Sequence, residues 1–150
     1  MALTDTIQND LKAALLGGDR FKADVLRGLK AAILNEEVAS GKRDEGLDDA
    51  EIERIVTREV KKRAESFRMY SENGRQELAD NERAESAVLE VYLPKQLSES
   101  EVVALVQQTI EEMGATGMQS MGLVIKSVKE KVGNTADGSL VARIVKEQLQ

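Results

Sequence analysis

The chain has 150 residues, of which 41% are hydrophobic and 32% are charged, with a formal net charge of −6. This composition is typical of one ordinary globular domain or two small ones, and it excludes a disordered chain. Cysteine and histidine are both absent, which excludes disulfides, zinc fingers, thiol nucleophiles and Ser–His catalysis. With few aromatic residues and one proline, we expect helices with aliphatic cores.

The hydropathy, the N-terminal sequence and the net charge exclude further classes of protein. No apolar run reaches transmembrane length, and the N-terminal sequence MALTDTIQND lacks the basic-then-apolar order of a signal peptide. We therefore predict a cytoplasmic protein with no membrane partner. Residues 1–94 hold 15 Lys and Arg against 20 Asp and Glu, and residues 95–150 hold 6 against 7. Such an acidic chain is not built as a general nucleic-acid binder.

Two helices are predicted before the first long loop. Apolar residues every four positions predict a helix over residues 3–15 that ends at the glycine pair 17–18. Asp19 is placed to cap a second helix, which fades before Gly41. The apolar stripes of these two helices are Leu3, Ile7, Leu11 and Leu15, then Phe21, Val25, Leu29 and Ile33.

Two longer helices follow the polar segment 40–49. Asp48 or Asp49 opens a third helix that ends near residues 72–74, and a fourth runs from about Arg75 to Tyr92. Pro94 stops the fourth helix, because proline cannot continue the hydrogen-bond ladder. The apolar residues of the third helix are Ile52, Ile55, Val56, Val60 and Phe67, and those of the fourth are Leu78, Val88, Leu89 and Tyr92.

Three shorter helices are predicted after the proline. Ser98 stands three residues before Glu101, the spacing of a capping box, and opens a helix that ends at Gly114. Apolar residues at helical spacing predict two more helices, over 121–132 and from about 139 to the end. The sequence thus predicts an all-α protein with a four-helix N-terminal domain, residues 1–94, and a smaller three-helix domain, residues 95–150.

The segment KVGNTADGSLV, residues 131–141, carries two glycines five apart and invites comparison with a phosphate-binding loop. A P-loop needs a preceding strand and a lysine after the second glycine. Here the preceding residues have helical period and no lysine follows. We interpret the segment as a tight turn in which Gly133 ends one helix in the αL conformation and Asp137, beside Gly138, caps the next. A phosphate or carboxylate at the start of the last helix stays an alternative.

Charged residues interrupt the apolar stripes of the third and fourth helices. Glu59 and Arg63 fall within the third stripe, and Glu82 and Glu85 fall within the fourth, with Arg75 near its edge. Because an unpaired buried charge is costly, we predict an interhelical ion network of these five residues. The alternatives are side chains that reach water from half-covered helices, a catalytic acid–base pair of Glu82 and Glu85, and a magnesium site made from the same residues.

The run RIVTREVKKRAESFR, residues 54–68, is locally basic. Its cations Arg54, Arg58, Lys61 and Lys62 could contact phosphates. Since no aromatic residues alternate with them to form a stacking platform, a solvated helix face is the simpler interpretation.

Two long segments resemble a known family. They are NGRQELADNERAESAVLEVYLPKQLSESEV, residues 73–102, and MGLVIKSVKEKVGNTADGSLVARIVKEQL, residues 121–149. Their order and spacing resemble the GatB/YqeY family over essentially the whole chain. The second part is similar to the tail domain of the GatB subunit of tRNA-dependent amidotransferase, which engages tRNA and does no chemistry.

The resemblance implies a free-standing module similar to a tRNA-contacting tail. Ammonia production and substrate activation have no counterpart in these residues, so a carbon–nitrogen ligase activity with glutamine as amido donor would rest on family analogy alone. The resemblance implies that the basic residues of the last two helices face RNA: Lys126, Lys129, Lys131, Arg143 and Lys146. They do not fall on one stripe of either helix, so we expect weak, salt-dependent binding or a need for a partner.

We therefore expect a non-catalytic module that binds tRNA or a tRNA-linked complex and that needs no cofactor and no metal. Its partner would be tRNA or a protein of tRNA metabolism. The alternatives are a protein-interaction adaptor that does not bind RNA, and an amidotransferase-associated protein in the sense of the resemblance.

Overall fold

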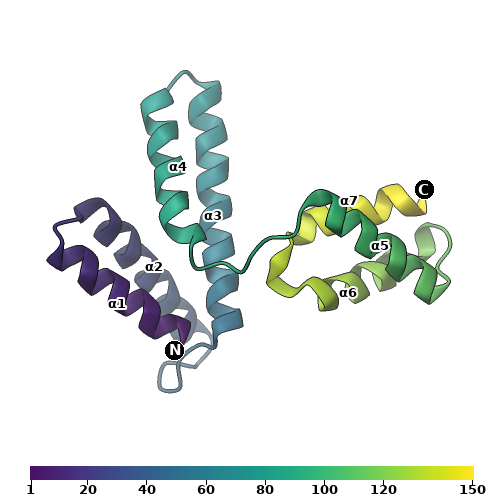
Figure 1. Cartoon of the computed structure of the whole chain (residues 1–150), viewed down its shortest axis with the longest axis horizontal. Coiled ribbons are helices and arrows are strands. Elements are labelled where there is room, and N and C mark those ends of the chain that lie inside the picture. Colours follow the sequence, from purple (N-terminus) through teal and green to yellow (C-terminus); the bar gives the residue numbers. More distant parts are fainter. The chain divides into compact units, whose positions relative to one another are not determined.

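A computed structural model describes residues 1–150 and contains seven α-helices and no strand (Figure 1). The all-α prediction is confirmed. The chain divides into two compact units, Met1–Leu93 and Pro94–Gln150, each with its own core of buried aliphatic side chains. No helix combines the length and the low polarity that crossing a bilayer requires.

The N-terminal unit is built from two helical hairpins. The first consists of α1 (Leu3–Leu16) and α2 (Arg20–Ala39), and the second of α3 (Asp49–Glu72) and α4 (Gln76–Glu90). Contacts link α1 with α3, and α2 with both α3 and α4. Two predicted helix starts are confirmed: the Asp19 carboxylate accepts a hydrogen bond from the Lys22 amide, and Asp48 forms a capping box with Glu51.

The core of this unit is aliphatic, as predicted, with one polar contact at its edge. The Tyr92 hydroxyl donates a hydrogen bond of 2.6 Å to Asp10 of α1. Three residues of the predicted apolar stripes are not buried, because Leu15, Phe21 and Leu78 are 49%, 39% and 43% exposed. In α1 the buried stripe continues from Leu11 to Ala14, since a period of 3.6 residues drifts away from a repeat of four.

The C-terminal unit contains α5 (Glu99–Met113), α6 (Met121–Val132) and α7 (Gly138–Leu149). Short 3-10 turns, η1 (Met118–Ser120) and η2 (Gly133–Thr135), precede and follow α6. The Ser98 hydroxyl accepts from the Glu101 amide, which is the serine half of the predicted capping box. Gly114 ends α5 with φ of 61°, in the left-handed region. The three helices pack on one another through valine-rich stripes.

Candidate functional site

The glycine-containing segment joins α6 to α7, as the sequence predicted. Gly133 ends α6 with φ of 54°, but its ψ is −126°, so the αL assignment is wrong. These angles resemble the first central position of a type II′ turn, where glycine is favoured, and the 3-10 turn η2 begins there. Asp137 caps α7 by accepting from the Ser139 amide, as predicted. Gly138 lies inside α7 as its first residue and is no part of the turn.

The same segment holds the polypeptide that enters the unit from Pro94. The Leu97 amide donates to the Thr135 carbonyl over 2.8 Å. The Gln96 side-chain amide donates to the Asn134 carbonyl over 3.0 Å. The residues between Gly133 and Asp137 therefore have a structural role that the sequence did not reveal: they anchor the chain just before α5 begins.

Two of the five predicted RNA-contacting cations are held within the C-terminal unit. The Lys131 ammonium donates to the buried Thr109 hydroxyl over 2.9 Å and pairs with Glu112 at 3.0 Å. The hydrogen bond from Lys131 lowers the pKa of the Glu112 carboxyl. Arg143 pairs with Glu99 at 2.7 Å, which ties α7 to α5. Both side chains are engaged by carboxylates of the same unit, so a phosphate would have to compete with these ion pairs.

The other three cations, Lys126, Lys129 and Lys146, are exposed and have no ion-pair partner in the structure. Lys129 lies at the start of α7, because a Cβ built on Gly138 would stand 3.4 Å from the Lys129 Nζ. The amide groups at a helix start favour an anion, and the adjacent ammonium adds to that preference. The Asp137 carboxylate, at the same helix start, opposes it.

The predicted ion network is smaller than expected. The Arg63 Nε lies 3.3 Å from a Glu85 carboxylate oxygen, and Nη1 lies 3.9 Å from Glu59. The three side chains are 18%, 26% and 15% exposed. Arg75 does not join this network, because it is the residue before α4 at the far tip of the hairpin. The interhelical ion pair is thus Arg63–Glu85.

Glu82 lies beside the network without an ion pair. Burial, and then the neighbouring Glu85 carboxylate, raise its pKa, while Arg63 opposes that rise. A carboxyl with a raised pKa acts in acid–base catalysis only where it lies in a cleft beside a second group placed for proton transfer. Glu82 and Glu85 stand one turn apart on the same helix, and the structure places no three carboxylate, His or Cys groups together as metal ligands.

The basic run on α3 is largely matched by neighbouring acids. Arg58 pairs with Glu36 of α2 at 3.3 Å, and Lys62 pairs with Glu59 at 3.0 Å. Arg68 forms ion pairs with carboxylates on both sides along α3. Salt bridges therefore occupy much of this helix surface, which favours the interpretation as a solvated face.

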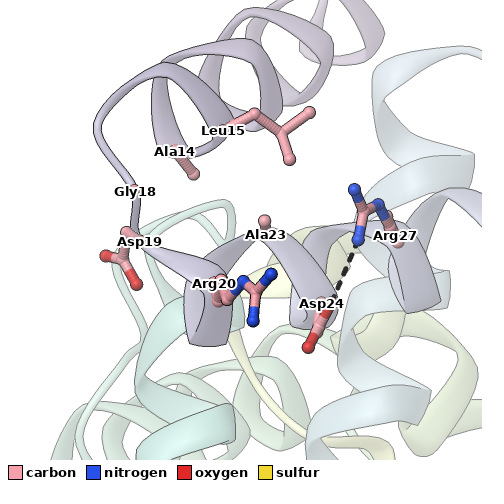
Figure 2. Close-up of a pocket in the computed structure, with 8 residues that line it drawn as sticks. All are labelled: Ala14, Leu15, Gly18, Asp19, Arg20, Ala23, Asp24 and Arg27. Carbon is pink, nitrogen blue, oxygen red and sulfur yellow. Dashed lines mark hydrogen bonds and ion pairs between the residues drawn. The ribbon is translucent and has the colours of Figure 1, made fainter.

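A depression of about 430 Å³ lies between the end of α1 and the first turns of α2 (Figure 2). Arg20, Asp24 and Arg27 line it from α2, and Arg27 pairs with Asp24 at 3.1 Å. No residue singled out as a site from the sequence lines it, and its charged groups include both signs. It holds no arrangement of nucleophile, base or phosphate-binding groups.

Comparison with known proteins places the whole chain in one family. The relatives include the fungal protein "Altered inheritance of mitochondria protein 41, mitochondrial" from several species. Identity is 35% over 61% of this chain and 51% of the protein from Eremothecium gossypii. The protein from Kluyveromyces lactis is 30% identical over 71% of this chain and 58% of its own length. The protein from Clavispora lusitaniae is 23% identical over 89% of this chain and 78% of its own length.

The chain spans about half the length of the first of these relatives. The family model for YqeY-like protein matches residues 4–149. The match spans both compact units and all seven helices, apart from the first residue of α1. The chain therefore belongs to the family of YqeY-like proteins.

Proposed function

We propose that this chain is a non-catalytic helical module whose C-terminal unit binds tRNA, or a complex that carries tRNA, through α6 and α7. The observation that carries the proposal is the set of exposed, unpaired lysines on these helices, one of which lies at the start of α7. Ammonium groups and helix N-termini are the groups that contact phosphate backbones without reading the sequence. The resemblance to an amidotransferase tail supports RNA as the ligand.

The affinity is expected to be modest. The C-terminal part of the chain has a net charge of −1, and Asp137 stands near Lys129. With three phosphate contacts, the logarithm of the binding constant should fall against the logarithm of the salt concentration with a slope of about −2 to −3. In a cell, such binding would depend on a second contact with a partner complex.

The test is a titration of labelled tRNA with the full chain at low and at physiological salt. A variant with Lys126→Gln, Lys129→Gln and Lys146→Gln should lose most of the binding and most of the salt dependence. The control removes three exposed cations of the N-terminal unit by Lys12→Gln, Arg20→Gln and Arg43→Gln, which changes the net charge equally. Absence of binding at low salt, or equal weakening in both variants, would contradict the proposal.

The cytoplasm remains the location predicted from the sequence. Several fungal relatives are named as mitochondrial proteins. Expression of the full-length natural protein with a fluorescent tag would decide between the two compartments for this chain.

A further inference from the structure

The outer side of the α1–α2 hairpin carries a cluster of cations near its turn. Residues 11–30 hold five Lys and Arg against two Asp, in a chain whose net charge is −6. Helical phase places Arg20 and Arg27 about 160–180° around α2 from the buried Leu29, so they face away from the core. Figure 1 shows the α1–α2 turn at the free end of the hairpin, clear of α3 and α4. We call this side the basic face: Lys12 and Leu15 of α1, and Arg20, Arg27, Lys30 and Leu34 of α2.

Two contacts show that the α1 and α2 parts of the basic face adjoin. The Lys30 ammonium of α2 donates a hydrogen bond to the Gln8 side chain of α1. Leu15 of α1 and Ala23 of α2 lie on either side of the depression of about 430 Å³, and the Arg27 side chain lines it as well (Figure 2). The depression can therefore receive one apolar side chain with guanidinium groups beside it.

The basic face keeps a net positive charge after its own ion pairs are counted. Arg27 pairs with Asp24 at 3.1 Å, and the Asp19 carboxylate caps α2. Asp5, the remaining acid on the outer side of α1, lies about two turns nearer to the N-terminus than the cation of that helix. Three cations have no carboxylate within ion-pair distance: Lys12, Arg20 and Lys30.

The basic face is also open to water. The side chains of Arg27 and Asp24 are 58% and 73% exposed, so their ion pair is accessible. Leu15 and Leu34 leave 49% and 40% of their surface exposed among the cations. Exposed leucines beside a depression are typical of a surface that takes an apolar group of a partner.

We infer that the basic face docks an acidic amphipathic helix of another protein, with an apolar side chain in the depression beside Leu15 and carboxylates on Lys12 and Arg20. Charge complementarity selects this occupant, and a seam between two helices is a usual groove for a third. RNA phosphates would match the cations but not the exposed leucines, and the basic face has no aromatic ring to stack on bases. A second copy would bring the same cations against these across a two-fold axis.

The probe is a fluorescent helical peptide with glutamates on one stripe and leucines on the adjacent one, added to the full chain. A peptide of the same composition with its glutamates dispersed around the helix is its control. Arg20→Glu should weaken binding of the first peptide by about tenfold. Because Arg20 is the first residue of α2, where a negative charge favours the helix, this variant should stay folded. Arg43→Glu, which reverses an exposed charge in the loop before α3, should leave the affinity within about twofold.

Leu15→Ala tests the depression separately from the charges. It should weaken binding of the first peptide by about threefold, because the peptide loses part of an apolar contact. Met69→Ala, which trims a side chain of α3 that is 53% exposed, should leave the affinity unchanged. Circular dichroism verifies that the helical content of each variant is retained.

The inference is overturned if the dispersed peptide binds equally well, if Arg43→Glu weakens binding as much as Arg20→Glu, or if tRNA displaces the peptide. Binding of the chain to phosphatidylglycerol vesicles that Arg20→Glu abolishes would also overturn it, because an anionic membrane would then be the partner of the face. A dimer of the chain alone that Arg20→Glu dissociates would do the same. These outcomes concern the N-terminal unit and are independent of the lysine test.

Discussion

At the scale of single residues, Glu82 and Glu85 show how one helical turn separates two roles. Glu85 reaches the Arg63 guanidinium across the hairpin, whereas Glu82 lies in the same half-buried region without a cation of its own. An ion pair that is only partly exposed stabilises the protein mainly because its loss leaves the other charge uncompensated. The two glutamates should therefore respond in opposite ways to neutralisation.

We predict that Glu85→Gln lowers the free energy of unfolding at pH 7 by about 1–2 kcal/mol, because Arg63 loses its interhelical partner. Glu82→Gln should instead cause no loss or a small gain at pH 7. Because the folded-state pKa of Glu82 is raised, its contribution to stability is present at low pH and is lost as pH rises through that pKa. Urea unfolding at pH 7 and pH 3 measures both effects.

At pH 3 the difference between Glu82→Gln and the natural chain should largely disappear, since both side chains are then uncharged. A double-mutant cycle of Arg63→Met with Glu85→Gln should give a coupling energy of about 1 kcal/mol. If Glu82→Gln destabilised the chain as much as Glu85→Gln at pH 7, our assignment of the ion pair would be wrong.

Sequence periodicity found that charges interrupt the stripes of α3 and α4, but it could not select the partners. Helical phase places Glu82 and Glu85 on the same side of α4, and only the relative shift of the two helices brings Glu85 to Arg63. The same limit applies to Lys131 and Arg143. Their partners Glu112 and Glu99 are distant in sequence, so the sequence could not show that packing already uses these cations.

At the scale of helices, the ends are determined by local chemistry and were therefore readable from the sequence. Asp19, Asp48, Ser98 and Asp137 each cap the helix that they precede, and Gly114 ends α5 in the left-handed region. Side-chain caps and glycine ends depend on residues within a few positions. The conformation of Gly133 was missed because the 3-10 turn after α6 depends on the docking of residues 96–97.

Gly133, at the end of α6, and Gly28, inside α2, allow a matched pair of predictions. Gly133→Ala should destabilise the chain by about 1 kcal/mol or more, because its φ of 54° is unfavourable for a residue with a Cβ. Gly28→Ala should stabilise it by about 0.5–1 kcal/mol, because Gly28 lies inside α2 and its added Cβ would meet no atom within 4 Å. Thermal and urea unfolding measure both.

Equal effects of the two alanines would mean that the backbone angle at Gly133 is not what requires glycine there. Loss of stability in Gly28→Ala would indicate a contact on the exposed side of α2. The comparison is informative because both variants add the same single methyl group.

At the scale of the whole molecule, the chain consists of two helical units of different chemical character. Residues 1–94 hold 20 Asp and Glu against 15 Lys and Arg, whereas the Pro94–Gln150 unit carries the unpaired lysines of α6 and α7. Composition and periodicity predicted the fold class because aliphatic stripes alone specify helices here. They could not predict a ligand, since no catalytic or phosphate-binding motif is present, and the family resemblance supplied that expectation.

The most direct test of the account is a ¹H–¹⁵N spectrum of the full chain during addition of uncharged tRNA at low salt. We predict that amide signals shift at Lys126, Lys129, Gly138 and Lys146, that signals of Met1–Leu93 stay in place, and that the tRNA is recovered chemically unchanged. Shifts concentrated in the N-terminal unit, or a tRNA recovered with a new covalent group, would contradict a non-catalytic module that binds RNA through α6 and α7.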